Sequence, residues 1–187
     1  MKVLAKMVLV LGLIAALSGF FLAYVNQKTY IRIKENQEKE IARAVFKLIP
    51  EGKDYKTSVI QGYRVYFVND ESKHFRGACI LTSGSGYQGE IKILVGLSYN
   101  FKSIKGIEIL ENVETPGLGG EISRKSFSSQ FERKSVSIPI KCVKGEKKNS
   151  NDIQAITGAT ISSDSVTRIV NRTLKKLVPL IKEYAKQ

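Results

Sequence analysis

The stretch EIKILVGLSYNFKSIKGIEIL, residues 90–110, decides the fold class that the sequence predicts. It holds two runs rich in β-branched and apolar residues, Glu90–Ser98 and Ile104–Leu110, and such runs are typical of β-strands. Two comparable runs precede it, SVIQGYRVYFV from Ser58 to Val68 and GACILTS ending at Ser83, and glycines punctuate the series. Together these runs predict an antiparallel meander.

Helices are predicted on both sides of the strands in the chain. Ile31–Leu48 places Ile33 and several later apolar residues near one face, and Pro50 ends the pattern. A final helix from about Asp164 to Tyr184 keeps apolar residues at helical spacing, and Pro179 falls in its last turns. We therefore expect one helix before the strands of the sheet and one helix after them in the chain.

Two further elements are predicted between the meander and the final helix. Phe127 and Phe131 stand four residues apart, which places both on one face of a short helix. The segment SVSIPIKCV, from Ser135 to Val143, reads as another strand. Its Pro139 cannot donate a backbone hydrogen bond, so an edge strand or a bulge is expected there.

The N-terminal segment predicts a membrane anchor. From Met7 to Val25 there is no charged residue and Ser18 is the one clearly polar side chain. A stretch of about 19 residues suffices to cross a hydrocarbon core of about 30 Å. A secretory signal would have an apolar region of roughly 7 to 15 residues and a small-residue cleavage site, which the sequence after Ser18 does not offer. The predicted domains are a transmembrane anchor at 1–26, a linker helix at 27–52 and a globular domain at 53–187.

The fold class is accordingly α+β: a mainly antiparallel sheet with flanking helices, preceded by one N-terminal transmembrane helix. The formal net charge is +13, from 30 Lys and Arg against 17 Asp and Glu. Such a charge suits nucleic acid, anionic lipid or a solvated basic surface, and alone it decides nothing. Because the Lys and Arg residues near the span lean toward its C-terminal side, charge alone does not fix the orientation either.

The cysteines and the single histidine limit the metal chemistry of this chain. Cys79 and Cys142 lie far apart without a CxxC spacing, and His74 is the only histidine. A zinc or iron–sulfur site is therefore not expected. We expect both cysteines to be small buried hydrophobes, with a Cys79–Cys142 disulfide as the alternative in an oxidising compartment.

Residues 157–163, TGATISS, stand between a short apolar segment and the final helix. The free N–H groups and positive dipole end of a helix start favour an anion, above all phosphate, and glycine with alanine permits close backbone approach. The alternative is an ordinary N-cap with additional serines. Both interpretations place polar groups at the helix start.

A second irregular segment, ETPGLGG at residues 114–120, follows the last predicted strand. Its three glycines and one proline prevent regular structure, and its exposed backbone groups suit a planar heterocycle. An ordinary turn is the alternative. The glycine-rich GSGYQG at residues 84–89 is a weaker signal, because neither a βαβ unit nor a Walker lysine accompanies it.

Taken in order, four motifs resemble the FMN-binding domain family: GYQGEIKILVGL, ETPGLGG, VKG at residues 143–145 and DIQAITGATISS. The resemblance spans almost the whole chain. It is strongest to the G subunits of Rnf electron-transport complexes, which are related to the C subunit of the sodium-translocating NADH:quinone reductase. The acidic residue that usually precedes the S/T-G-A-T motif corresponds to Asp152, whereas Ser162-Ser163 after Ile161 departs from the usual T-S.

The resemblance implies a covalent flavin. In this family the second threonine of S/T-G-A-T carries FMN through a phosphoester, which places the attachment on Thr160. Lys144 corresponds to the lysine of the family's V-K-G segment and is expected to bond to the cofactor, whereas Tyr87 is expected near the ring or in ordinary packing. The remaining expected contacts are Thr157, Gly158, Ala159, Ser162 and Ser163 around the phosphate, and Glu114, Thr115, Gly117, Leu118 and Gly119 against the ring.

The resemblance further implies a function and a location. The expected role is a redox subunit of a membrane complex that moves electrons between reduced ferredoxin and NAD, coupled to ion translocation, with no catalytic residue of its own. The expected partners are the other subunits and a flavin transferase, and the domain is expected on the periplasmic side of the inner membrane. Two alternatives remain: a quinone reductase C-type subunit, disfavoured by the compact domain, and an anchored binding module without redox function that docks lipid or an acidic partner. Nucleic acid is not an expected partner, because the charges are scattered and no binding motif is present.

Overall fold

The structure is a computed structural model that describes residues 2–184. The chain forms two compact units, of which the first ends at Glu40 and the second begins at Ile41. Helix α1 (Lys2–Leu48) provides the whole of the described part of the first unit and the beginning of the second.

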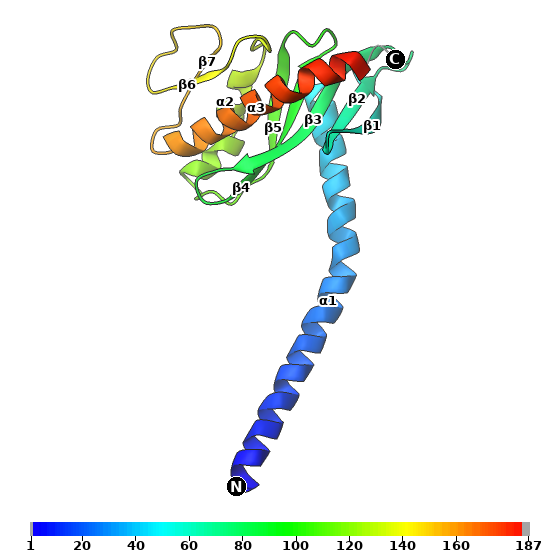
Figure 1. Cartoon of the computed structure of the whole chain (residues 1–187), viewed down its shortest axis with the longest axis vertical. Helices are drawn as coiled ribbons and strands as arrows, with labels where there is room; N and C mark the ends of the chain where they lie inside the picture. Colours follow the sequence, from blue (N-terminus) through cyan, green and yellow to red (C-terminus); the bar gives the residue numbers. More distant parts are fainter. Residues whose placement is uncertain (1, 185–187) are drawn as a thin grey trace. The chain divides into compact units, whose positions relative to one another are not determined.

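The first unit is the part of α1 that precedes Ile41, drawn in shades of blue in Figure 1. Its large hydrophobic side chains from Val3 to Val25 are exposed, and the helix is long and apolar enough to cross a membrane. Such exposure in water would be costly, so these residues need lipid or another protein around them. The helix runs without a break through residues 27–40, which contain neither proline nor glycine.

The second unit contains a five-stranded antiparallel sheet in the order β1-β2-β3-β4-β5, which confirms the predicted fold class. Every strand pairs with its neighbour in sequence, as a meander requires (Figure 1). The strands are β1 (Asp54–Ile60), β2 (Tyr63–Asn69), β3 (Phe75–Ser85), β4 (Glu90–Ser98) and β5 (Ile104–Glu111).

The segment Ser58–Val68, predicted as one strand, is instead a hairpin between β1 and β2. Gln61 and Gly62 form its turn with φ values of 48° and 82°. Two successive residues at positive φ match the right-handed twist of a two-residue hairpin, and glycine adopts this conformation without strain. The dipeptide Gln-Gly was the local signal for the turn.

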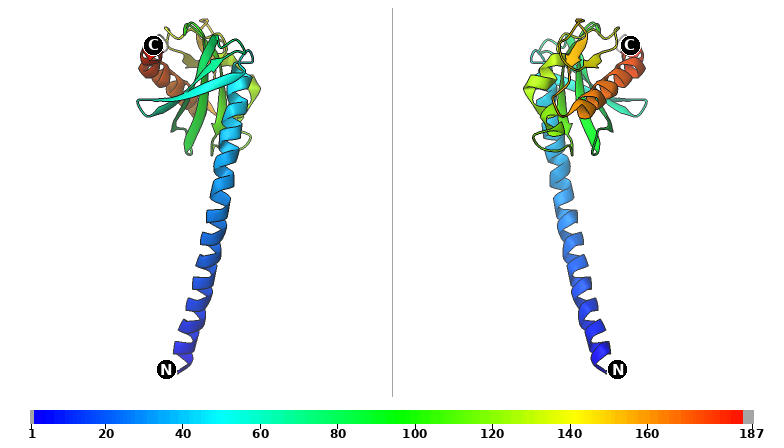
Figure 2. Two further views of the ribbon diagram at one scale, coloured as in Figure 1. Left: turned by 90° about the vertical axis from the view of Figure 1, so that its right-hand side faces the viewer. Right: turned by 90° about the vertical axis from the view of Figure 1, so that its left-hand side faces the viewer.

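The sheet is covered on both faces. Side chains alternate along β2, so that Val65 faces one hydrophobic cluster and Tyr66 the other. The first cluster includes the apolar face of α3 (Thr160–Tyr184), which lies along the sheet in Figure 2. The second cluster is closed by the last turns of α1 and Ile49. Ile41, Val45 and Leu48 are buried there as the predicted helical face requires, but Ile33 remains exposed in the first unit.

The chain between β5 and α3 is mostly irregular. Helix α2 (Lys125–Ser128) lies between two 3-10 helices, Gly119–Ser123 and Ser129–Phe131, followed by β6 (Lys141–Val143) and β7 (Asp152–Gln154). The rings of Phe127 and Phe131 are buried with their centroids 5.6 Å apart, which confirms their predicted common face. Strands β6 and β7 pair in parallel.

The strand predicted at Ser135–Val143 is correct only for its last three residues. Before β6, the segment makes one isolated bridge, between Ser135 and Ser103, and asparagine side chains bind other parts of its backbone. Asn151 accepts a hydrogen bond from the Ser135 N–H, and Asn171 accepts one from the Ile140 N–H. Pro139 has no N–H group, so the segment cannot form a regular ladder of hydrogen bonds with a neighbouring strand. The asparagine side chains instead accept hydrogen bonds from its N–H groups.

Both cysteines are free thiols. Cys79 is buried in the sheet, and this burial raises the pKa of its thiol. Cys142 is half-buried on β6, and its pKa is raised chiefly by burial as well. The structure therefore agrees with the interpretation of small packed side chains, and the alternative disulfide is not formed.

Candidate functional site

The start of α3 lies within the motif TGATISS. The helix begins at Thr160, four residues before the predicted start at Asp164. The turn before it is closed by the Ala159 N–H, which donates to the Ile156 carbonyl at 3.0 Å, and Gly158 adopts a φ of +80° that favours glycine. The N–H groups of the first helical residues have no carbonyl four residues earlier in the helix, so they form a seat for an anion.

Ser163 explains the early start of the helix. Its buried hydroxyl accepts the Ile156 N–H at 3.0 Å and donates to the Ala159 carbonyl at 2.9 Å. These two bonds tie the first turn of α3 to the preceding loop. Ser163 therefore maintains the backbone around Thr160, and its hydroxyl is already occupied within the protein.

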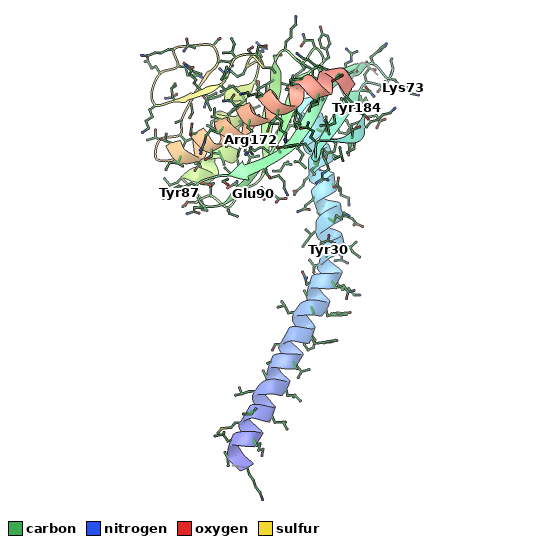
Figure 3. The ribbon with its side chains drawn as sticks, viewed as in Figure 1. Tyr30, Lys73, Tyr87, Glu90, Arg172 and Tyr184 are labelled. Carbon is green, nitrogen blue, oxygen red and sulfur yellow. The ribbon has the colours of Figure 1, made fainter. Side chains whose placement is uncertain are left out.

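A cavity of about 450 Å³ opens beside this turn. It brings together the loop between β3 and β4, the ETPGLGG segment and the start of α3, which are far apart in sequence. Tyr87 extends from the β3–β4 loop at this end of the sheet (Figure 3). The lining residues are Tyr87, Glu114, Thr115, Leu118, Gly119, Gly158, Ala159, Thr160, Ile161 and Ser162.

Glu114 connects the three segments. Its side chain is only 6% exposed, and its carboxylate accepts the Ser162 hydroxyl at 2.6 Å through Oε2. Oε1 accepts the backbone N–H groups of Tyr87 at 2.7 Å and Gln88 at 3.1 Å. Hydrogen bonds to an ionised acceptor are among the stronger ones in proteins. We name this set of three bonds the Glu114 clasp.

Two glycines leave the room that the clasp requires. A Cβ atom on Gly86 would lie 2.3 Å from Oε1 of Glu114. A Cβ atom on Gly119 would lie 2.5 Å from Oε2 and 2.6 Å from the Ser162 hydroxyl. Any side chain at either position would collide with the carboxylate or its partner. These glycines therefore act through close approach, not through backbone freedom.

The cavity is lined by both apolar side chains and polar groups. Its apolar lining residues Tyr87, Leu118 and Ile161 are 65%, 48% and 56% exposed. Thr160 and the N-terminal turn of α3 supply polar groups beside them. This combination matches a ligand that has a flat apolar part and an anionic end.

Most of the predicted site residues meet at this cavity, and four do not line it. Gly117, Thr157 and Lys144 are exposed outside it, and Ser163 is buried behind it. Lys144 follows β6 in an exposed bend. Among the cavity residues, Glu114 and Ser162 also bond to each other.

Sequence reasoning missed two residues of the site. Ile161 lines the cavity, and the signal for it in the sequence was its position directly after Thr160 in the TGATISS motif. Gln88 donates its side-chain amide to the Thr115 hydroxyl at 2.7 Å, in addition to its backbone bond to Glu114. Gln88 lies within the glycine-rich segment GYQG, which was the sequence signal for it. Among residues 2–184, no group of three or more His, Cys, Asp or Glu side chains is arranged to hold a metal ion.

Comparison with known proteins places this site within a family. The model of the FMN-binding domain matches residues 86–175, a range that contains all three segments of the cavity. The G subunit of the Na(+)-translocating ferredoxin:NAD(+) oxidoreductase complex of Acetobacterium woodii is 31% identical over 191 residues, covering 93% of this chain and 91% of that protein. This chain belongs to the FMN-binding domain family, among the G subunits of ion-translocating oxidoreductase complexes.

Further relatives agree with this membership. The G subunit of the ion-translocating oxidoreductase complex of Methanosarcina acetivorans is 29% identical over 88% of this chain and 89% of its own. The C subunit of the Na(+)-translocating NADH-quinone reductase from Parabacteroides distasonis has a similar structure, with a TM-score of 0.63 over 79% of this chain and 92% of that one. Because its sequence identity is 19%, that likeness shows the fold alone.

Proposed function

We propose that this protein is an electron-transfer subunit of a membrane-bound, ion-translocating ferredoxin:NAD oxidoreductase complex, and that it carries FMN as a phosphoester on Thr160. One observation carries the proposal. Thr160 lines the cavity as the first residue of α3, where an attached phosphate would meet the free N–H groups of the helix start. The names of the similar G subunits supply the complex and its reaction.

The residues present fit FMN. The cavity volume of about 450 Å³ falls within the range of about 300–1,000 Å³ of small-molecule sites. Thr160 and the N-terminal turn of α3 suit a phosphate, and the apolar lining side chains suit an isoalloxazine ring. Gly158 and Ala159 leave the backbone open beside Thr160, since neither residue has a side chain beyond Cβ. We expect Leu118, Ile161 and Tyr87 to contact the ring.

FMN supplies the redox chemistry when it is bound. The chain provides the position: the first turn of α3 orients the Thr160 hydroxyl, and Ser163 fixes that turn from behind. Attachment requires a flavin donor whose phosphate is joined to a leaving group. The bond from Thr160 Oγ to phosphorus forms, the bond from phosphorus to the leaving group breaks, and the hydroxyl proton passes to the leaving group. A flavin transferase is the partner expected for that step.

The membrane assignment rests on α1. Its uncharged stretch supports a single-pass protein, and the exposed apolar side chains of residues 3–25 need a nonpolar environment. We propose that the second unit lies on the periplasmic side, where covalent attachment would prevent loss of the flavin. Cysteine-specific labelling from outside intact cells, on a variant with a new exposed cysteine such as Lys144→Cys, tests this orientation. Protection of that cysteine until the membrane is opened would reverse the proposed side.

Intact mass of the full chain, expressed with a flavin transferase, tests the attachment. The wild type should gain roughly 438 Da, the mass of FMN less water, and keep its visible absorbance after denaturation. Thr160→Ala should gain nothing, whereas Thr160→Ser should retain some attachment because it keeps a hydroxyl. Thr157→Ala is the matched control, since it removes the exposed hydroxyl three residues earlier. An unmodified wild type beside an active transferase would favour a binding module without flavin.

A further inference from the structure

Glu114 has two possible roles in the site, and the choice between them rests on the flavin site proposed above. A carboxylate that lines a flavin cavity could bond to the ring or could shape the cavity. Ionised carboxylate oxygens provide about four acceptor positions in total. Three of them are taken by the Ser162 hydroxyl and the N–H groups of Tyr87 and Gln88. The protein itself thus uses most of the bonding capacity of this side chain.

The surroundings of the Glu114 carboxylate support the second role, in which it shapes the cavity. Glu114 is buried, and among residues 2–184 no lysine, arginine or histidine forms an ion pair with it. The partners of its oxygens are therefore hydrogen-bond donors of the protein and not a cationic side chain. A buried carboxylate keeps such an arrangement only when each donor is held in place.

The clasp joins parts of the chain that are distant in sequence at this end of the sheet. Its bonds span 26, 27 and 48 residues. Ser162 lies two residues after Thr160 in the first turn of α3, and Tyr87 forms another wall of the cavity. The carboxylate therefore sets the distance between the acceptor threonine and the apolar wall.

We propose that Glu114 is a positioning residue for flavin attachment: its carboxylate locks the β3–β4 loop to the first turn of α3 and so forms the cavity before any flavin arrives. Gly86 and Gly119 are part of the same arrangement, because a side chain at either residue would collide with the Glu114 carboxylate. The ring is then contacted by the apolar wall, and Glu114 acts through Ser162, Tyr87 and Gln88.

The decisive comparison is between two substitutions at one position. Glu114→Gln keeps an oxygen for the two backbone N–H groups, and its amide can donate to the Ser162 hydroxyl, so all three bonds survive. Glu114→Ala removes them all. Ser162→Ala removes one. Glu121→Ala is the matched control, because Glu121 lies in the same region, pairs with Arg124 at 2.7 Å and does not line the cavity.

Two readouts on the full chain in detergent separate positioning from general damage. The first is the rate of flavin attachment with a flavin transferase, followed by intact mass. The second is hydrogen exchange at the backbone amides of Tyr87 and Gln88 in the unmodified protein, which requires no flavin. We expect Glu114→Ala to attach flavin about tenfold or more slowly and to lose protection at both amides, since a hydrogen bond to a charged group that is lost typically changes an equilibrium by at least that factor.

The conservative variant decides the outcome. Glu114→Gln should attach flavin within about threefold of the wild-type rate, and Ser162→Ala should fall between the two Glu114 variants. If Glu114→Gln is as slow as Glu114→Ala while its two amides stay protected, the carboxylate acts directly on the flavin and the proposal is wrong. If Glu114→Ala does not fold, the Glu114→Gln and Ser162→Ala results still decide it. A wild type that never gains mass refutes the flavin site itself, whatever the Glu114 variants do.

Discussion

Glu114 and Asp152 are both buried carboxylates that accept backbone N–H groups, but their donors come from different distances along the chain. Glu114 binds donors 26 to 48 residues away, in two other segments of the site. Asp152 binds the N–H groups of Lys148 and Asn149 and the side-chain amide of Asn149, all within four residues. One carboxylate joins three segments, and the other closes its own loop.

This difference separates tertiary from local stabilisation. Removing a long-range bond releases segments whose ordering depends on the rest of the fold, whereas removing a local bond loosens one loop. The Glu114 clasp should therefore affect the cavity and global stability together. The Asp152 loop, between β6 and β7, should affect mainly its own surroundings.

The largest effect is expected from Glu114→Ala. It leaves two backbone N–H groups and one hydroxyl unpaired, and we expect the free energy of unfolding to fall by about 3 kcal/mol, because each buried unsatisfied group costs about 1–3 kcal/mol and the open cavity admits water to some of them. Urea unfolding of the full chain in detergent measures it. Glu121→Ala should change stability by less than about 1 kcal/mol, since its pair with Arg124 is exposed on the arginine side. Equal losses in both variants would contradict a special role for the clasp.

Gly119→Ala should disturb the same clasp, because its new methyl group would crowd the Glu114 carboxylate. The new Cβ would lie 2.5 Å from Glu114 Oε2 and 2.6 Å from the Ser162 hydroxyl, so one of the two must move. We expect a loss of about 1–3 kcal/mol in the free energy of unfolding, as for overpacked interiors. Gly120→Ala is the matched neighbour, because its nearest contact would be the Thr115 carbonyl at 3.3 Å, and its cost should be clearly smaller. A Gly120→Ala variant that is the less stable of the two would refute the crowding argument.

The sequence predicted the parts of the fold that follow from local patterns. The β-branched and apolar runs in Glu90–Ser98 and Ile104–Leu110 predicted strands that the structure contains as β4 and β5. The hairpin at Gln61-Gly62 was missed because the strands on either side have the same composition as one longer strand. The segment Ser135–Ile140 was misread because its backbone has only an isolated bridge to Ser103 and otherwise bonds in part to the side chains of Asn151 and Asn171, which no periodicity reveals.

The site was predicted less completely, for a related reason. Motifs identified the segments that meet at the cavity, including Thr160 and Leu118. The motifs did not reveal which polar groups point into the cavity and which form hydrogen bonds with each other. Ser162 and Glu114 were predicted as cofactor contacts, and their bond to each other was not predicted. Such pairing depends on three-dimensional proximity across 48 residues, so it lies beyond any local pattern.

Smaller effects are expected where a glycine matters only for its backbone conformation. Gly117, in the segment of Glu114, and Gly145, before Asp152, have φ values of +76° and +91° with no atom within 4 Å of a new Cβ. Alanine at either position should cost about 1 kcal/mol of the free energy of unfolding, and equally in both loops, because the strain is local. Gly145→Asn should recover part of this loss, since asparagine tolerates positive φ better. Urea unfolding of the three variants measures these costs, and a much larger cost at Gly117 would mean that its conformation also supports the clasp.

The smallest effect at neutral pH is expected from Asp152→Asn, because the amide oxygen can still accept the bonds that Oδ2 accepts now. What changes is the pH dependence. The N–H of Asn149 above all, with the N–H of Lys148 and the Asn149 side chain, lowers the pKa of Asp152 below its usual value. A carboxyl group whose pKa is lower in the folded state stabilises the protein above its unfolded pKa of about 3.9, and this contribution is lost as the pH falls through the folded value.

The stability difference between wild type and Asp152→Asn should therefore be constant near pH 7, shrink below about pH 4 and vanish below the folded pKa. Unfolding monitored across this pH range measures it. Asn149→Ala removes only the side-chain donor, so it should reproduce part of the same pH dependence. A stability difference that does not change with pH would mean that the charge of Asp152 contributes nothing to the stability of its loop. The two carboxylates would then be alike only in the geometry of their hydrogen bonds.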